Sequence, residues 1–167
     1  LRLGADVVVH SLTKFINGAS DVIAGAVCST EDFIAELMDL YTGSLMLLGP
    51  TMDPKTAFEI SMRLPHLGIR MRAHSERAMG IATRLHDLDL PVVYPGLPSH
   101  PEHALMTEQL NRGYGYGGLL TLNLNSLGRA NAFMEHLQNQ HAFGIMEVTP
   151  GHTDTHTSQN RPSTPSK

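Results

Sequence analysis

The sequence has 167 residues, of which 41% are hydrophobic and 17% charged, and its formal net charge is −4. This composition is typical of a folded globular chain, and the length alone predicts one domain. The acidic balance argues against nucleic acid or a membrane surface as the main partner, since both need a basic stripe. No stretch approaches the roughly 20 apolar residues of a membrane span. A single cysteine, Cys28, excludes an internal disulfide framework and indicates a reducing compartment, here expected to be the cytoplasm.

The first half of the sequence alternates strand and helix patterns. In chain order it predicts a strand over 6–10, a polar turn over 11–21, a strand over 22–28, a helix from about 30 to Leu40, a loop over 43–50 and a helix from 53 to Pro65. The β-branched run in the first strand is typical of a strand buried on both faces of a parallel sheet, so its covering elements are expected upstream. Asp53 followed by Pro54 is a strong helix start, because proline at the first helical position loses no hydrogen bond.

The second half begins with a long amphipathic pattern. Apolar residues recur at spacings of three and four from Leu67 to Leu85, which predicts a helix to about Leu88 after the interruption at Pro65. Beyond it we expect a short strand over 92–94, a helix over 101–111, a glycine-rich turn over 113–118, a strand over 119–124, a helix over 128–138 and a final strand over 143–148. Residues 149–167 contain no aliphatic or aromatic side chain and are predicted to be disordered.

The clearest chemical signal is Lys14, which follows the first predicted strand in the segment Ser11, Leu12, Thr13, Lys14. A primary amine in an apolar crevice loses its proton more readily and then attacks an aldehyde, and pyridoxal phosphate (PLP) is the common aldehyde cofactor. The hydroxyls of Ser11 and Thr13 alternate with Leu12, so both can reach a phosphate beside the lysine. Taken alone, the same pattern also suits a surface lysine in a Ser/Thr turn, since lysine is seldom fully buried.

Residues 4–25 closely resemble the cofactor-lysine signature of the Cys/Met-metabolism PLP enzymes. That family includes cystathionine synthases and lyases, O-acylhomoserine sulfhydrylases and methionine γ-lyases. The shared pattern is a strand followed by S-x-T-K and then by G-x-x-D-x-x-x-G, which here begins at Gly18. Three later segments, 45–54, 64–71 and 94–103, are most similar to the plant methionine γ-lyase branch of the family. The similarity covers residues 1 to about 148.

The resemblance implies an α/β fold of the type I, aspartate-aminotransferase-like class of PLP-dependent transferases. Residues 1–64 would be the end of the large PLP-binding domain. Residues 65–148 would form a long bridging helix and most of the small α+β C-terminal domain, with 149–167 as a tail. The resemblance therefore replaces the single domain that the length suggests with parts of two domains.

The resemblance also implies roles for individual residues. Lys14 is the catalytic lysine that forms the aldimine with PLP, and Ser11 and Thr13 bind the cofactor phosphate. We interpret Asp21 as a structural residue that orders the lysine loop. The implied reaction is γ-elimination of methionine to methanethiol, 2-oxobutanoate and ammonia, with a small sulfur amino acid as the substrate. Cystathionine lyase or γ-synthase chemistry, or O-acylhomoserine sulfhydrylase chemistry, is the alternative.

The family builds the rest of its cofactor site upstream of the first predicted strand. Its substrate-carboxylate arginine has no counterpart here, because Arg161 lies in unrelated sequence. We therefore expect the 167-residue chain by itself to be inactive. Intact family members are expected to be homo-oligomers, so a second possibility is a catalytically dead subunit that associates with a full-length homologue.

Two other motifs suggest different functions, but the further residues that each function needs are missing from the sequence. The segment from Ser11 to Lys14 also matches S-x-x-K, the acylation motif of penicillin-binding proteins, but S-D-N and K-T-G are absent from the sequence. Ten histidines raise the question of a metal. His100 and His103 flank Pro101 and Glu102, which departs from H-E-x-x-H, and the proline spoils a helical pairing of ligands. No metal site is expected.

Overall fold

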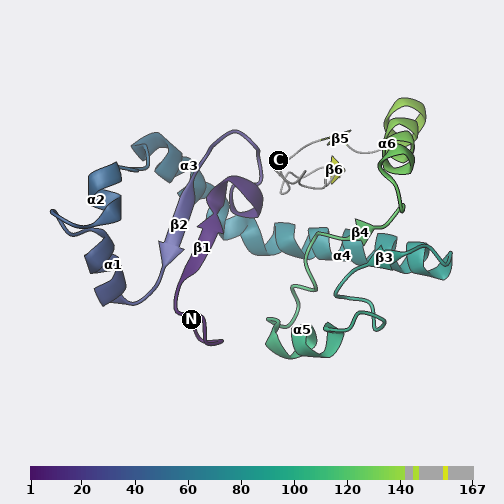
Figure 1. The fold of residues 1–167 in the computed structure, drawn as a ribbon, viewed down its shortest axis with the longest axis horizontal. Coiled ribbons are helices and arrows are strands. Elements are labelled where there is room, and N and C mark those ends of the chain that lie inside the picture. Colours follow the sequence, from purple (N-terminus) through teal and green to yellow (C-terminus); the bar gives the residue numbers. More distant parts are fainter. Residues whose placement is uncertain (142–144, 147–155, 158–167) are drawn as a thin grey trace, which may run out of the picture. The chain divides into compact units, whose positions relative to one another are not determined.

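The computed structural model describes residues 1–141, 145–146 and 156–157. The chain divides into two compact units, Leu1–Pro65 and His66–Lys167 (Figure 1). Within the described residues, no helix has the length and apolar character that crossing a bilayer requires. Both units contain helices and short strands, which agrees with the α/β class predicted from the sequence.

The N-terminal unit is built around a two-stranded antiparallel sheet. Strand β1 (Val8–Ser11) pairs with β2 (Gly25–Cys28), with Ser11 opposite Gly25. The helical turn η1 (Leu12–Ile16) follows β1 directly. The prediction of a parallel strand buried on both faces is wrong for this structure, because Val9 is 74% exposed. Among the described residues β1 pairs with β2 alone, and the pairing is antiparallel, so the parallel sheet with helices on both faces that would bury this strand is not formed.

Three helices complete the N-terminal unit: α1 (Glu31–Leu37), α2 (Ser44–Leu48) and α3 (Pro54–Arg63). The predicted helix start at Asp53 is confirmed. The Thr30 hydroxyl accepts from the Phe33 amide at the start of α1, and Asp53 accepts from two amides at the start of α3. The predicted loop over 43–50 is wrong, since α2 occupies its centre. Leucine and methionine are good helix formers, and Gly49 ends α2 in the left-handed conformation at φ +64°.

The C-terminal unit is organised on the long helix α4 (Leu67–Asp87). A short helical turn, η2 (Leu64–His66), separates α3 from α4 at Pro65, as predicted. Strands β3 (Val92–Val93) and β4 (Thr121–Leu122) pair antiparallel. The buried apolar cluster of this unit lies between α4 and the segment after β3, and it contains Ala78, Ala82, Tyr94 and Leu97.

The remaining elements follow β3 along the chain. Helix α5 (His103–Gln109) lies within the predicted range, and α6 (Leu127–His141) runs three residues beyond its predicted end. Strands β5 (Ile145–Met146) and β6 (His156–Thr157) pair in parallel. Apart from these two short strands, the predicted final strand and the predicted tail lie outside the described residues.

The glycine-rich turn between α5 and β4 packs against α4. The Tyr94 hydroxyl donates to the Gly117 carbonyl at 2.9 Å, and the Gly117 amide donates to the Ser75 hydroxyl at 3.0 Å. Gly113, Gly115 and Gly117 all have positive φ angles, between +73° and +89°. Only glycine adopts this region at low cost, which explains the spacing of the glycines in the sequence.

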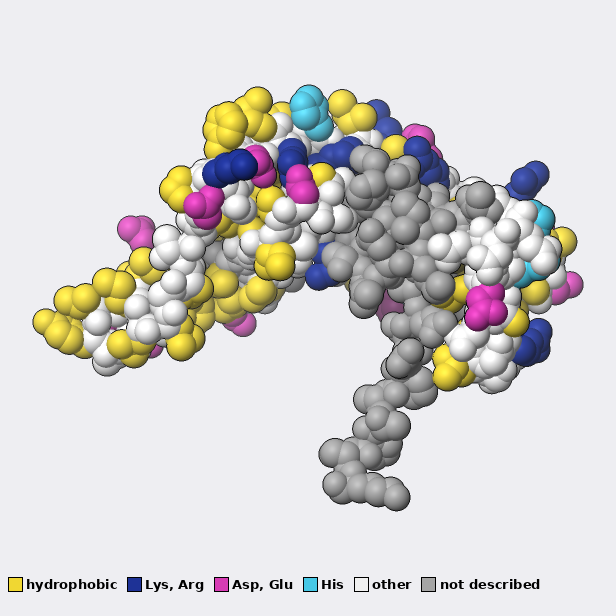
Figure 2. Space-filling view, turned by 90° about the horizontal axis from the view of Figure 1, so that it is seen from above, with side chains coloured by type: hydrophobic (Ala, Val, Ile, Leu, Met, Phe, Trp, Pro, Cys, Tyr) yellow, Lys and Arg dark blue, Asp and Glu magenta, His cyan; other side chains and the backbone are white. Residues whose placement is uncertain are grey.

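Apolar side chains lie exposed on the N-terminal unit. Tyr41 and Leu48 are 81% and 82% exposed, and Ile23 is 94% exposed. In Figure 2 the yellow side chains gather at the left, over the α1 and α2 region. Exposed apolar patches of this kind are typical of surfaces that contact another protein chain.

Candidate functional site

Lys14 lies in the turn η1, directly after β1. Its backbone is non-helical, with φ −85° and ψ −122°, in the middle of an otherwise helical turn. The side chain is half-buried, and Nζ donates a hydrogen bond to the Ser11 Oγ at 3.2 Å. The structure therefore brings together two of the three residues that the sequence assigns to the cofactor.

The hydroxyl of Thr13, the third predicted residue, bonds the backbone of Ala24. It donates to the Ala24 carbonyl at 3.2 Å and accepts from the Ala24 amide at 2.9 Å. The amides of Leu12 and Thr13 donate to the same carbonyl. In this structure Thr13 thus ties the turn η1 to the segment just before β2, a structural contact that the sequence analysis did not expect.

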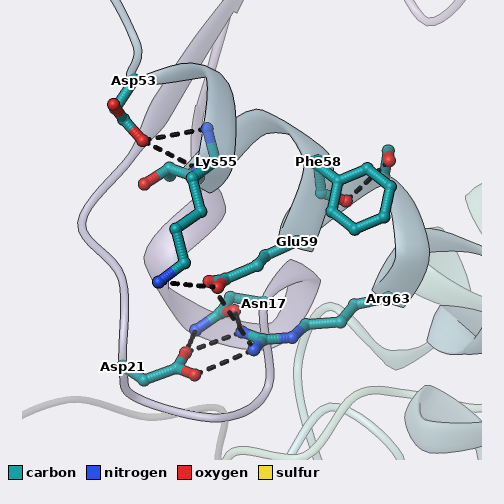
Figure 3. Close-up of polar contacts among 9 residues, drawn as sticks. Asn17, Asp21, Asp53, Lys55, Phe58, Glu59 and Arg63 are labelled. Carbon is teal, nitrogen blue, oxygen red and sulfur yellow. Dashed lines mark hydrogen bonds and ion pairs between the residues drawn. The ribbon is translucent and has the colours of Figure 1, made fainter.

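A second polar cluster holds the other end of the turn (Figure 3). Two guanidinium nitrogens of Arg63 donate to the two carboxylate oxygens of Asp21, at 2.6 and 2.8 Å. The Asn17 side-chain amide donates to Asp21 at 3.1 Å, and Arg63 also donates to the Asn17 side-chain oxygen. The hydrogen bonds from Arg63 and then from Asn17 lower the pKa of Asp21 from 3.8 to about 2. Asp21 is therefore ionised at neutral pH and pairs with Arg63 as a forked ion pair.

The cluster continues along α3 through weaker contacts. Glu59 lies 3.9 Å from Arg63, and Lys55 lies 3.9 Å from Glu59. Both are pairs of residues four apart on one helix, and such partly exposed pairs contribute little to stability. The strong contacts of Arg63 are consequently those with Asp21 and Asn17 on the lysine turn.

Sequence reasoning found Asp21 but missed Arg63 and Asn17. The contacts of Asp21 agree with its predicted role in ordering the lysine loop. Arg63 is 42 residues away from Asp21, at the end of a helix whose start the sequence predicts. A local pattern carries no signal for such a pairing. The one available hint was an arginine in the last turn of a well-capped helix that follows the lysine segment.

The histidines singled out in the sequence contact backbone groups. The His100 Nδ1 accepts from the Glu102 amide at 3.1 Å, and the His103 Nδ1 lies 2.8 Å from the Pro95 carbonyl. The His103 ring also stacks on Tyr116. Among the residues described, no group of three or more potential metal ligands is present. These histidines are therefore local structural residues here.

Comparison with known proteins places the lysine turn in a family. The family described as "Cys/Met metabolism PLP-dependent enzyme" matches residues 1–159. The chain belongs to this family. The resemblance inferred from the lysine signature is thereby confirmed, and the relatives of the chain are PLP-dependent lyases and synthases.

Individual members of the Cys/Met metabolism family are similar over most of the chain. Methionine gamma-lyase of Arabidopsis thaliana is 54% identical over 166 residues, which is 99% of this chain and 38% of that protein. Chloroplastic cystathionine gamma-synthase 1 of the same plant is 38% identical over 127 residues, covering 75% of this chain and 21% of its own length. The chain thus spans less than two fifths of these relatives.

Solved structures agree with the family assignment. Cystathionine gamma-synthase from Xanthomonas oryzae, in complex with aminoacrylate and cysteine, has a TM-score of 0.77 and 31% identity. The match covers 94% of this chain and 39% of that one. A second structure of the same enzyme, in complex with cystathionine, has the same TM-score and 32% identity. The fold of the chain is therefore similar to part of the fold of cystathionine gamma-synthase.

The donor set of the lysine turn fits the PLP on which the family depends. PLP needs a primary amine for its aldehyde and hydrogen-bond donors for its phosphate. Lys14 would supply the amine. The Ser11 hydroxyl accepts from Lys14, so its own proton can be donated to an anionic oxygen. Lys14 and Ser11 are thus the two described residues that fit the cofactor directly.

Proposed function

We propose that Lys14 is the cofactor lysine of a PLP-dependent carbon–sulfur lyase and that the complete protein eliminates the γ-methylthio group of methionine as methanethiol. The observation that carries this proposal is the pairing of Lys14 with Ser11 on a turn with the family's S-x-T-K pattern. Identity supports methionine as the substrate, since it is 54% to a methionine gamma-lyase and 38% to a cystathionine gamma-synthase. The products would be methanethiol, 2-oxobutanoate and ammonia.

The residues of the turn have separate tasks in this proposal. PLP, when bound, supplies an electron sink that makes elimination possible. The Lys14 amine would hold the cofactor until the amino group of the substrate takes its place. The freed amine would then accept the proton from Cα and move protons at Cβ, so that the thiolate can leave from Cγ. Ser11 donates to the phosphate. Thr13 is assigned to the phosphate by the family pattern, and it can donate there only after its proton leaves the Ala24 carbonyl.

Labelling of the lysine tests this site. Pyridoxal phosphate is added to the purified chain, borohydride reduces the adduct, and mass spectrometry of peptides gives the label at Lys14 relative to Lys55. Lys55 is a suitable internal reference, because its side chain is 84% exposed and therefore reports nonspecific reaction. We expect Lys14 to be labelled preferentially, and Ser11→Ala to reduce that preference. Equal labelling of both lysines would contradict the proposal that Lys14 is the cofactor lysine.

Cystathionine chemistry is the second candidate reaction. Cystathionine gamma-synthases of Mycobacterium tuberculosis are 41% identical over 133 residues, and the cystathionine gamma-lyase of Dictyostelium discoideum is 35% identical over 141. Thiol release from methionine, compared with product formation from cystathionine, distinguishes the two substrates. We expect the 167-residue chain by itself to turn over neither, since the family places further cofactor residues outside the segment that this chain matches.

Association without catalysis is the second kind of function that an observation favours. The α1–α2 region exposes large apolar side chains, among them Tyr41 and Leu48. We propose a full-length homologue as the partner, since family members are expected to be oligomers. Size-exclusion chromatography of the chain with Arabidopsis methionine gamma-lyase should then give a mixed species. Separate elution of the two proteins would contradict this role.

The single exposed Cys28 supports a cytoplasmic location, which fractionation of cells would test.

A further inference from the structure

Arg63 connects the end of α3 to the turn that carries Lys14. Its two bonds to Asp21 and its bond to Asn17 span 42 and 46 residues of sequence, and all three residues belong to the N-terminal unit. A guanidinium binds a carboxylate with two parallel hydrogen bonds, which fixes orientation as well as distance. Arg63 therefore restrains the position of the turn relative to α3.

The restraint reaches Lys14 through Asn17. The Asn17 side chain is buried, with 2% of the residue exposed, and is held by Arg63 and Asp21. The backbone amide of Asn17 donates to the Leu12 carbonyl at 2.8 Å. The backbone amide of Gly18 donates to the Lys14 carbonyl, also at 2.8 Å. Fixing Asn17 thus fixes the carbonyl groups on both sides of the lysine.

Thr13 holds the turn from the other side. Its hydroxyl and its amide bond the backbone of Ala24 just before β2. Lys14 therefore lies between two anchors, one at Thr13 and one at Asn17. The backbone of Lys14 is not helical, although its carbonyl accepts from the Gly18 amide, so the two anchors add to the hydrogen bonds within the turn. The anchors supply the order that a bound cofactor would otherwise have to impose at an entropic cost.

The anchor at Arg63 consists of two groups that are charged at neutral pH. The pKa of Asp21 is about 2, so the carboxylate keeps its charge throughout the neutral range. The Asp21 carboxylate in turn raises the pKa of Arg63, which is charged in any case. Both groups are therefore charged near neutral pH, and the pair does not act as a pH switch there.

We propose that Arg63 is a positioning residue that holds the Lys14 amine in place for the cofactor, through Asp21 and Asn17. This inference rests on the proposed function of Lys14. It adds a residue that touches neither the lysine side chain nor the phosphate-binding hydroxyl in the contacts described above. Its effect is on the order of the turn and on the selectivity with which Lys14 takes up the aldehyde.

Two measurements on the whole chain test the proposal. The first is amide hydrogen exchange over residues 12–24, which needs no cofactor. The second is the Lys14-to-Lys55 ratio of borohydride-trapped pyridoxyl label. Arg63→Gln removes the charge and the fork, whereas Arg63→Lys keeps the charge alone. Arg84→Gln, the same change on α4 in the other unit, is the matched control, and circular dichroism checks that each variant is folded.

We expect Arg63→Gln to speed exchange over 12–24 and to lower the label ratio, each by about fivefold to tenfold, because it removes charge-assisted bonds to a partly buried cluster. Arg63→Lys should give intermediate values, since an ammonium cannot form the bidentate pair. Arg84→Gln should match the wild type. If Arg63→Gln unfolds, the comparison of Arg63→Lys with the wild type decides.

The outcomes separate this inference from the function on which it rests. If the wild-type chain labels Lys14 and Lys55 equally, the proposed function fails, while hydrogen exchange still shows whether Arg63 orders the turn. If exchange rises in the Arg63 variants and the label ratio stays at the wild-type value, Arg63 is merely structural and the inference is overturned. Unchanged exchange in both Arg63 variants overturns it as well.

Discussion

Each of the two units is stabilised internally by a different kind of contact. Among the described hydrophobic residues of the N-terminal unit, only Ile60 is buried. The buried polar residue of this unit is Asn17, which bonds Arg63. The C-terminal unit buries an apolar cluster, which consists of Ala78, Ala82, Tyr94 and Leu97. Directional polar bonds thus fix the lysine turn, whereas close packing fixes the region around α4. The two regions should respond differently to loss of volume and to loss of charge.

The exposed apolar residues of the N-terminal unit sharpen this difference. Val9 on β1 and Ile23 before β2 are 74% and 94% exposed, although both lie in segments whose composition is typical of buried strands. The C-terminal unit covers its central residues with its own chain, since Tyr94 is completely buried. An apolar pattern therefore predicts which residues favour burial, and only the neighbouring elements decide whether burial occurs.

Truncation of Tyr94 should have the largest effect on stability. Tyr94→Ala removes a fully buried ring and is expected to lower the free energy of unfolding by about 3–5 kcal/mol. Tyr94→Phe keeps the ring and loses the hydroxyl, which lies 2.9 Å from the Gly117 carbonyl and 3.4 Å from the Ser75 carbonyl, so we expect a loss of about 1 kcal/mol. Urea denaturation followed by circular dichroism measures both. Equal losses would mean that the hydrogen bond, and not the packing, holds this unit.

A methyl group in the glycine-rich turn should have the next largest effect. Gly115 has φ +73°, and a Cβ there would lie 2.6 Å from the Ser75 Cβ on α4. Gly113→Ala is the matched control, because it has φ +89° but no atom within 4 Å, so it should cost only about 1 kcal/mol of backbone strain. Gly115→Ala should cost about 1–3 kcal/mol more, from overpacking. Denaturation of the two variants side by side tests this, and equal costs would show that the turn moves away from α4 freely.

Neutralising Asp21 should have the smallest effect and the clearest pH dependence. The folded-state pKa is lowered from 3.8 to about 2, so the ion pair stabilises the folded chain above the ordinary value and is lost as pH falls through the folded value. Asp21 is 48% exposed, which limits the contribution to less than about 1 kcal/mol. The difference in unfolding free energy between wild type and Asp21→Asn should be constant above about pH 5 and shrink as the pH falls towards 2.

That acid titration is done by urea denaturation at constant ionic strength. Glu59→Gln serves as the control, because Glu59 reaches Arg63 only at 3.9 Å and does not contact the lysine turn in the bonds shown in Figure 3. A difference between wild type and Asp21→Asn that persists unchanged to pH 2 would mean that the carboxylate charge is not its origin.

Local chemistry made much of the fold predictable. The start of α3 follows from Asp53 and Pro54, the start of α1 from Thr30, and the break before α4 from Pro65. Each is a property of a few neighbouring residues, such as a capping oxygen or a missing amide. Helix α2 escaped the same reasoning, because its five residues are too short to display a helical period, even though Gly49 could have been recognised as its end.

The same contrast between neighbours in the sequence and contacts in space applies to the candidate site. The sequence by itself determined the family, since the S-x-T-K pattern and the spacing to Asp21 carry the resemblance that the family match confirms, and the same pattern is the basis for proposing Lys14 as the reactive amine. Only the tertiary structure decided what holds that amine. Arg63 reaches the turn from the end of a helix more than 40 residues away, and Thr13 uses its hydroxyl on Ala24. A sequence pattern records which groups are near in the chain, whereas hydrogen bonds and ion pairs depend on distance in space, which only the packing of β1, β2 and α3 sets.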